Sequence, residues 1–218
     1  MSHTTTQPKV NIINALQKMQ HTAILFVVAY VISQIRIQIR APPFPYPDWF
    51  EQILPLVGVG VVLTVFVAII LLIGLYAMFI PGLSDLAQVN TEFSGSLLLI
   101  KIGYLFGLVL FIIGSIMMGI ILAQLTSIDV VVLIIAGYVC LASLILIFVG
   151  DIGVCILCYK LNSLYGGVLY VIAILLIILG TPFTILKIPA WLLVFAALQD
   201  TIKKLQTSTT QGFTQGLS

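Results

Sequence analysis

Charged side chains are scarce in this chain. Lys and Arg number 9 and Asp and Glu number 7 among 218 residues, which is 7%, whereas soluble domains carry about 25%. The scarcity excludes a water-soluble globular domain, and a net charge of +2 is too small to indicate nucleic-acid binding. Hydrophobic residues make up 61% of the sequence and its mean hydropathy is +1.24. The solvent of this protein is therefore a lipid bilayer.

Metal-binding side chains are equally few. The two histidines are His3 and His21, so a bis-histidine haem or a histidine-rich copper site between spans is excluded. Cys140, Cys155 and Cys158 lie in apolar runs and cannot all pair. Cys155 and Cys158 have the spacing of a metal pair, but zinc needs four ligands and no second pair completes the site. We expect three unpaired, structural cysteines, no metal and no cofactor.

Catalytic motifs are also missing. The sequence contains no P-loop, GxSxG, HExxH or nucleophile–base pair. Five of the seven acidic residues fall at the ends of apolar runs or between them, so no chain of carboxylates crosses the bilayer: Asp48, Glu51, Asp85, Glu92 and Asp129. These absences predict a protein that is not an enzyme.

The long apolar runs predict an all-α integral membrane bundle. Several runs reach the roughly 20 residues that a helix needs to cross a bilayer. The last run contains Lys187 and Pro189, so five spans remain an alternative to six. A polar tail over 1–19 precedes the transmembrane domain 20–200, and a second tail covers 201–218. The predicted spans are 20–39, 52–80, 96–124, 129–158, 164–179 and 183–198.

The connections between spans carry interfacial residues and helix stops. The proline-rich segment 41–47 cannot be helical, and the Asp48–Glu51 spacing of a capping box starts the second helix. Pro81 and Gly82 are expected to stop that helix, with a short interfacial helix over 83–94 and a tight turn over 159–162. We expect four residues to anchor the chain among the lipid headgroups: Arg36, Arg40, Tyr46 and Trp49.

Six spans place both termini on one side of the membrane. Five lysines then share the side of the termini, namely Lys9, Lys18, Lys160, Lys203 and Lys204. Arg36, Arg40 and Lys187 lie opposite. Because basic residues favour the cytoplasmic side, the bias predicts a cell-membrane protein with both ends in the cytoplasm.

Three glycines form a stripe on the third span. Gly103, Gly107 and Gly114 lie within about 40° of one another around the helix. Small residues on one face let helix backbones approach closely in lipid. The stripe therefore predicts a helix–helix contact, either inside the bundle or across a dimer seam, and a bundle of six helices favours the internal contact.

Lys101 lies inside the third span, opposite that stripe. A lysine within a membrane must pair, reach water or lose its proton, and this makes it a candidate functional residue. Asp151, near the end of the fourth span, is the partner that an antiparallel arrangement allows. The alternative, which we favour, is that Lys101 extends to the headgroups and that Asp151 has already reached the interface.

Four features lie between about Ser94 and residue 200: Gly95, then Lys101–Ile–Gly103 with Gly107, the turn 158–167, and Thr181–Pro182 before the last apolar segment. In these features the chain resembles a family of uncharacterised multi-pass membrane proteins of thermoacidophilic archaea. The family has no established activity, so the resemblance implies a kind of cell and no mechanism.

Apolar helices without a polar constellation favour a structural or accessory subunit. Such a protein packs against membrane lipids and other membrane subunits, or against copies of itself, through helix faces. The alternative is a small transporter or channel-forming protein, which normally needs polar groups or broken helices near the bilayer midplane.

Overall fold

The computed structural model describes residues 6–34, 49–123, 130–181 and 183–215, and this part of the chain is helical without strands. The prediction of an all-α bundle is confirmed. Five helical segments are long and apolar enough to cross a membrane, and Val168–Gly180 is a shorter apolar helix. The five are Asn11–Ser33, Gly58–Val89, Thr91–Ile121, Val130–Tyr165 and Thr184–Thr207.

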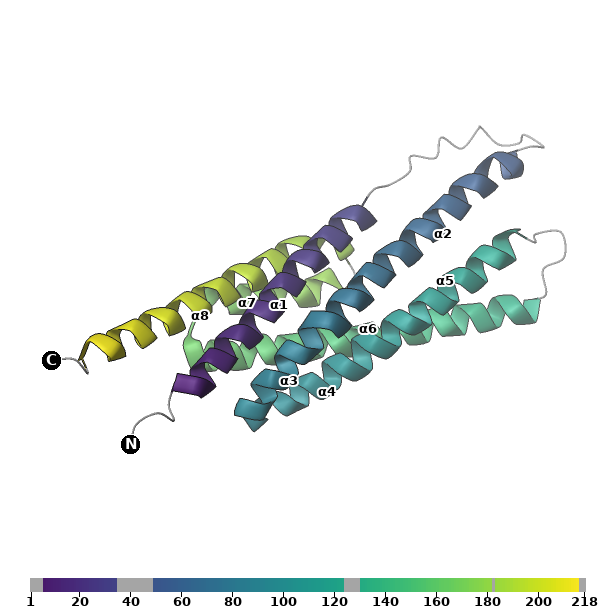
Figure 1. Cartoon of the computed structure of the whole chain (residues 1–218). Coiled ribbons are helices and arrows are strands. Elements are labelled where there is room, and N and C mark those ends of the chain that lie inside the picture. Colours follow the sequence, from purple (N-terminus) through teal and green to yellow (C-terminus); the bar gives the residue numbers. More distant parts are fainter. Residues whose placement is uncertain (1–5, 35–48, 124–129, 182, 216–218) are drawn as a thin grey trace.

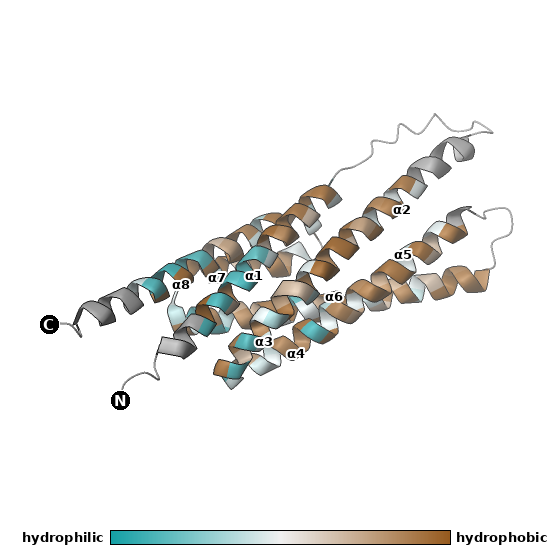
Figure 2. Ribbon diagram, in the orientation of Figure 1, coloured by the Kyte–Doolittle hydropathy of each residue, from teal (hydrophilic) through white to brown (hydrophobic). Residues whose placement is uncertain are grey.

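The helices run side by side in one elongated bundle (Figure 1). α1 begins and α8 ends at the same end of it, where the hydrophilic residues also gather (Figure 2). In chain order the helices are α1 (Thr6–Ser33), α2 (Trp49–Gly74), α3 (Ile80–Val89), α4 (Ser94–Ile100), α5 (Gly107–Ala123), α6 (Val130–Tyr165), α7 (Val168–Gly180) and α8 (Lys187–Gln215). Short 3₁₀ turns, Thr91–Phe93 and Thr184–Leu186, precede α4 and α8.

Two π-helical turns make α2–α3 and α4–α5 into continuous rods. Leu75–Phe79 joins α2 to α3, and Lys101–Phe106 joins α4 to α5. The predicted stop at Pro81 is therefore wrong, because the helix runs on to Val89. A proline clashes with the carbonyl four residues earlier in a regular helix, and the wider π turn directly before Ile80 changes the backbone there. α3 packs on α1 instead of forming an interfacial helix.

The fourth helix also runs further than expected. The residues of the predicted turn over 159–162 belong to α6, which continues to Tyr165. The chain turns instead at Gly166 and Gly167, whose φ angles are 66° and 152°. Glycine adopts these angles without steric cost, which is why two adjacent glycines end a helix better than Lys and Asn do.

The helix of the last apolar segment is longer than the helix before it. α7, the fifth predicted span, has 13 residues and is about 20 Å long. The segment Thr184–Thr207, whose crossing was in doubt, is long and apolar enough to span. It packs against α1 and α7.

An aromatic cluster lies where α1, the two π turns and α8 meet, and we call this part of the bundle the packed end. The ring of Phe26 from α1 lies 4.5 Å from that of Trp191 from α8, edge to face, and 6.3 Å from that of Phe79. The Tyr104 ring meets Phe26 at 6.4 Å in the same geometry. Edge-to-face pairs of this kind stabilise beyond the area they bury, and here they hold α1, the two π turns and α8 together.

Candidate functional site

A buried ion pair joins α6 to α8 inside the bundle. Lys187 Nζ donates to Asp151 Oδ2 at 2.8 Å and to Oδ1 at 3.1 Å. The two residues are 6% and 2% exposed. Apolar runs flank Asp151 on both sides, so the pair lies within the apolar length of α6. Ionisable groups at such a place are costly to bury and mark functional sites by default.

Two hydroxyl groups complete the shell of the Asp151 carboxylate. The Tyr104 hydroxyl donates to Oδ1 at 2.5 Å, and Thr181 Oγ1 donates to Oδ2 at 3.3 Å. Each carboxylate oxygen thus accepts from the ammonium and from one hydroxyl. Four hydrogen bonds from three side chains therefore converge on one buried carboxyl group, so the site is an assembled charge pair and not an accidental contact.

Glycines make room for two of the three partners of Asp151, Tyr104 and Lys187. A Cβ on Gly150 would lie 2.6 Å from the ring of Tyr104, and one on Gly180 would lie 2.8 Å from Cγ of Lys187. Tyr104 also stands in a π turn, a feature that recurs at functional sites because it changes which residues face inward. Close glycine contacts and an irregular helix together bring the two side chains to the carboxylate.

The ion pair lies at one end of a cavity of about 920 Å³. This volume is at the upper end of the roughly 300–1,000 Å³ typical of ligand sites. α1, α2, α5, α6 and the α7–α8 connection line it. Lys187 and Tyr104 are lining residues, whereas Asp151 stands behind them. Ser33, Thr181 and Thr184 are exposed lining residues, so they form the rim of the cavity.

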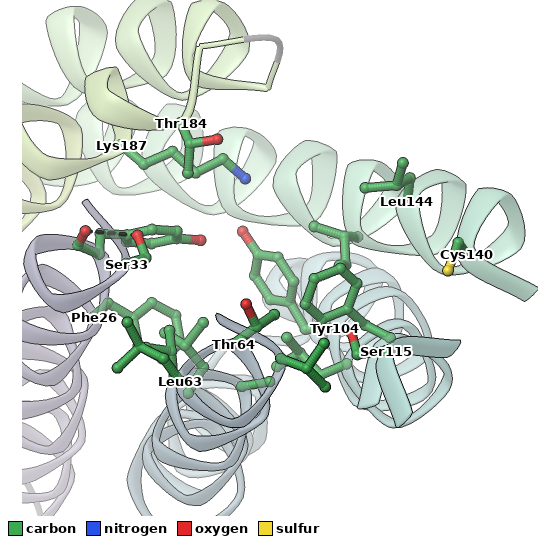
Figure 3. A pocket seen from close by; sticks show the side chains of 18 of the residues that line it. Phe26, Ser33, Leu63, Thr64, Tyr104, Ser115, Cys140, Leu144, Thr184 and Lys187 are labelled. Carbon is green, nitrogen blue, oxygen red and sulfur yellow. Dashed lines mark hydrogen bonds between the residues drawn. The ribbon is translucent and has the colours of Figure 1, made fainter. Parts of the chain in front are cut away.

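The cavity is polar at one end and apolar along its length. In Figure 3 the amine of Lys187 and the hydroxyl of Tyr104 point toward the cavity, and Leu144 and Cys140 line its far part. The lining residues of α2 and α5 away from the ion pair are mostly aliphatic or aromatic: Val61, Leu63, Val67, Leu71, Leu108 and Phe111. This separation matches an amphiphilic molecule.

No group of three or more His, Cys, Asp or Glu residues that could hold a metal ion occurs in the part of the chain that the structure describes. Cys140, Cys155 and Cys158 are free thiols, and Cys140 lines the cavity. The chemistry that the site offers is hydrogen bonding and charge. The Lys187 ammonium and the hydroxyls at the rim can hold a polar group.

The proposed pair between Lys101 and Asp151 is wrong. Lys101 is exposed, and Asp151 binds Lys187 instead. The reason lies in the glycine stripe opposite Lys101, because that stripe faces α6. A Cβ on Gly103 would lie 2.6 Å from Cα of Gly150, the residue directly before Asp151. Lys101 therefore points away from α6, as the headgroup alternative requires, whereas Asp151 is buried instead of interfacial.

The whole glycine stripe contacts α6 within this chain. A Cβ on Gly107 would lie 2.9 Å from the backbone nitrogen of Ile147, and one on Gly114 would lie 2.8 Å from Sγ of Cys140. The stripe thus forms the close internal contact that was favoured over a dimer seam.

The interfacial anchors cannot be placed in the same way. Arg36, Arg40 and Tyr46 lie outside the described residues. Trp49 is the first residue of α2, and its side chain is not described. Their role stays a prediction.

Sequence reasoning missed Lys187, Tyr104 and Thr181. Lys187 was counted among the charges outside the membrane, although it lies in an apolar segment. A signal was present, because Asp151 and Lys187 are opposite charges within two apolar runs, and a glycine directly precedes Asp151. Tyr104 carried no comparable signal, since its inward direction depends on the π turn.

Comparison with protein-family models, with curated proteins and with solved structures finds no match to this chain. The resemblance to archaeal membrane proteins therefore stays a prediction that rests on its quoted residues.

Proposed function

We propose that this protein is a non-catalytic multi-pass membrane protein that binds a lipid-soluble molecule in its intramembrane cavity, as a small transporter or carrier does. The observation that supports the proposal is the Lys187–Asp151 pair at the end of a cavity of about 920 Å³. A purely structural ion pair has no need of such a space beside it. Polar groups held between helices at membrane depth are the arrangement that transporters use for their substrates.

The proposal includes an orientation. Both chain ends belong to the cytoplasm, because the buried Lys187 no longer counts against the lysine bias, which leaves five lysines against Arg36 and Arg40. The rim residues Ser33 and Thr184 lie at the far end of α1 and at the start of the α8 segment. The cavity then opens toward the outer side of the membrane. Protease-accessible tags at the two ends on opposite sides would contradict this orientation.

A substitution that fills the cavity tests the binding function. Thr64 lines the cavity, whereas Val62 on the same helix is 69% exposed. We expect Thr64→Trp to remove the small molecules that native mass spectrometry detects on the purified protein, because the indole occupies their space. Val62→Trp is the matched control and should retain them.

Ser115→Phe fills the same cavity from α5, with Ile116→Phe, 44% exposed, as its control. If both cavity-filling variants fold and carry the same bound molecules as their controls, the cavity is not the binding site.

The role of a structural or accessory subunit is the second candidate. In the first turns of α6, the side chains from Val130 to Ile135 are between 39% and 64% exposed, and all are apolar. Lipid or the helices of a larger assembly can cover this face equally well. Co-purification in mild detergent that depends on α6 would support this candidate.

A further inference from the structure

We propose that the cavity takes a single-chain amphiphile with an anionic headgroup, a carboxylate or a phosphate, which Lys187 binds while the hydrocarbon chain lies between α2, α5 and α6. This inference rests on the proposed binding function and names the class of ligand. Different residues of the cavity indicate the headgroup and the hydrocarbon chain of the ligand.

The headgroup is anionic because the cavity meets the cation of the pair and not the anion. Lys187 lines the cavity and Asp151 does not. The Asp151 carboxylate already accepts from Lys187, Tyr104 and Thr181, so its oxygens are committed to these donors. An ammonium has three protons to donate, and a charge-assisted bond to a ligand oxyanion can share them. A cationic headgroup would face the ammonium and be repelled.

The surroundings of Lys187 favour the same charge. α8 begins at Lys187, so the partial positive charge of its amino end lies at this end of the cavity. Thr184 at the exposed rim adds a hydroxyl donor. Asp151 balances the charge of Lys187, which makes the buried lysine tolerable.

The hydrocarbon chain of the ligand is inferred from the length and polarity of the cavity. Along α5 and the π turn before it, the cavity extends from Tyr104 to Met118, and these 14 helical steps correspond to about 21 Å. On α2 it extends from Leu71 to Gly60, about 17 Å. The hydroxyl of Thr64, in the middle of this stretch, donates to the Gly60 carbonyl at 2.8 Å and so offers the groove little polarity. An extended hydrocarbon chain fits this shape.

The decisive experiment compares ligands of one chain length and different charge. Protein in nanodiscs of zwitterionic phospholipid is titrated with hexadecanoate, hexadecyl phosphate, methyl hexadecanoate and hexadecyltrimethylammonium. We expect either anion to bind at least tenfold more tightly than the neutral ester, and the cation to bind most weakly. The stronger of the two anions distinguishes a free fatty acid from a lysolipid-like phosphate, and either supports the proposal. Equal binding of ester and anions overturns it.

Variants separate the headgroup from the fold. Lys187→Met alone leaves Asp151 unpaired and can unfold the protein, so the test uses Lys187→Met with Asp151→Asn, which has no net charge at the site. We expect this double variant to bind the ester as the parent does and the anions about ten- to a hundredfold more weakly. Lys187→Arg should retain most of the anion binding. Unchanged anion binding in the double variant contradicts the assignment of Lys187.

The failure of this inference differs from the failure of the proposed function. If Thr64→Trp removes binding of all four probes equally and no charge preference exists, the cavity binds molecules without headgroup recognition. If Thr64→Trp changes the binding of none of them, the cavity is not used at all and both proposals fall.

Discussion

At one end of the bundle the helices pack through large side chains, whereas the α5–α6 hairpin beyond Gly107 closes through small residues. Phe79 and Trp191 at the packed end are each 1% exposed. In the most apolar part of α6, only 11% of the residues are buried, against 44% in α1. Glycines form the contacts here. Within the hairpin, Gly114 of α5 lies beside Cys140 of α6, and between the hairpin and α2, Gly119 lies beside Val61.

The difference shows how a bilayer changes the requirements of packing. Exposed apolar side chains cost nothing against lipid, so the hairpin needs only a seam where backbones approach closely. The packed end contains buried charge, and charge needs a fixed partner. The cavity lies where the two kinds of packing meet, because α1 and the α7–α8 connection end there while α2, α5 and α6 continue (Figure 1).

The largest effect is expected from breaking the ion pair. Lys187→Met leaves the Asp151 carboxylate buried without its cation, and such a change costs about 3–5 kcal/mol. The free energy of unfolding in mixed micelles measures it. Lys101→Met is the control, since Lys101 is exposed, and it should cost little. Adding Asp151→Asn to Lys187→Met should recover part of the loss. Equal costs for the two lysine variants would contradict the pairing.

Truncating one buried and one exposed aromatic ring compares packing against protein with packing against lipid. Phe79→Ala removes a ring from the buried cluster and should destabilise by about 3–5 kcal/mol. Phe66, on the preceding helix, is 54% exposed, and Phe66→Ala should cost less than about 1 kcal/mol because lipid replaces the ring. The melting temperatures of the two variants in detergent measure the difference. Similar melting temperatures would show that the buried cluster is no tighter than the exposed face of α2.

The glycine seam is tested by adding one methyl group. Gly103→Ala places a Cβ about as close to Leu146 O, 2.7 Å, as to Gly150 Cα, so α4–α5 and α6 must separate, at about 1–3 kcal/mol. Gly137→Ala on α6 meets nothing within 4 Å and should gain up to about 1 kcal/mol from helix propensity. We therefore expect the two substitutions to change the free energy of unfolding in opposite directions. A loss of stability at both positions would show that the close contact at Gly103 is not the cause.

The smallest effect concerns a charge pair outside the apolar region. Lys18 on α1 donates to Asp85 on α3 at 2.6 Å, and both side chains are about half exposed. Lys18→Met should cost about 0.2–1 kcal/mol, and the cost should fall with added salt. A loss as large as that of Lys187→Met would show that burial does not distinguish the two pairs.

Much of the fold could be predicted from the sequence, and the errors have physical causes. Apolar length predicted the helices, and the three-glycine face correctly indicated a close contact. The stop at Pro81 failed because a π turn accommodates the proline, and the turn at 159–162 failed because the glycines that follow are better helix stops. Of the candidate ion pair, Asp151 was found and its partner was not.

The sequence alone determined the solvent, the helical class and the face of α5 that carries glycine, since each follows from composition or from a periodicity of 3.6 residues. Only the tertiary structure decided which cation Asp151 meets. Lys187 lies 36 residues away along the chain, and helices that are apolar all round carry no local mark of the face that turns inward. Close contacts at Gly103, Gly150 and Gly180 bring the helices together, so that Tyr104 and Lys187 reach the same carboxylate.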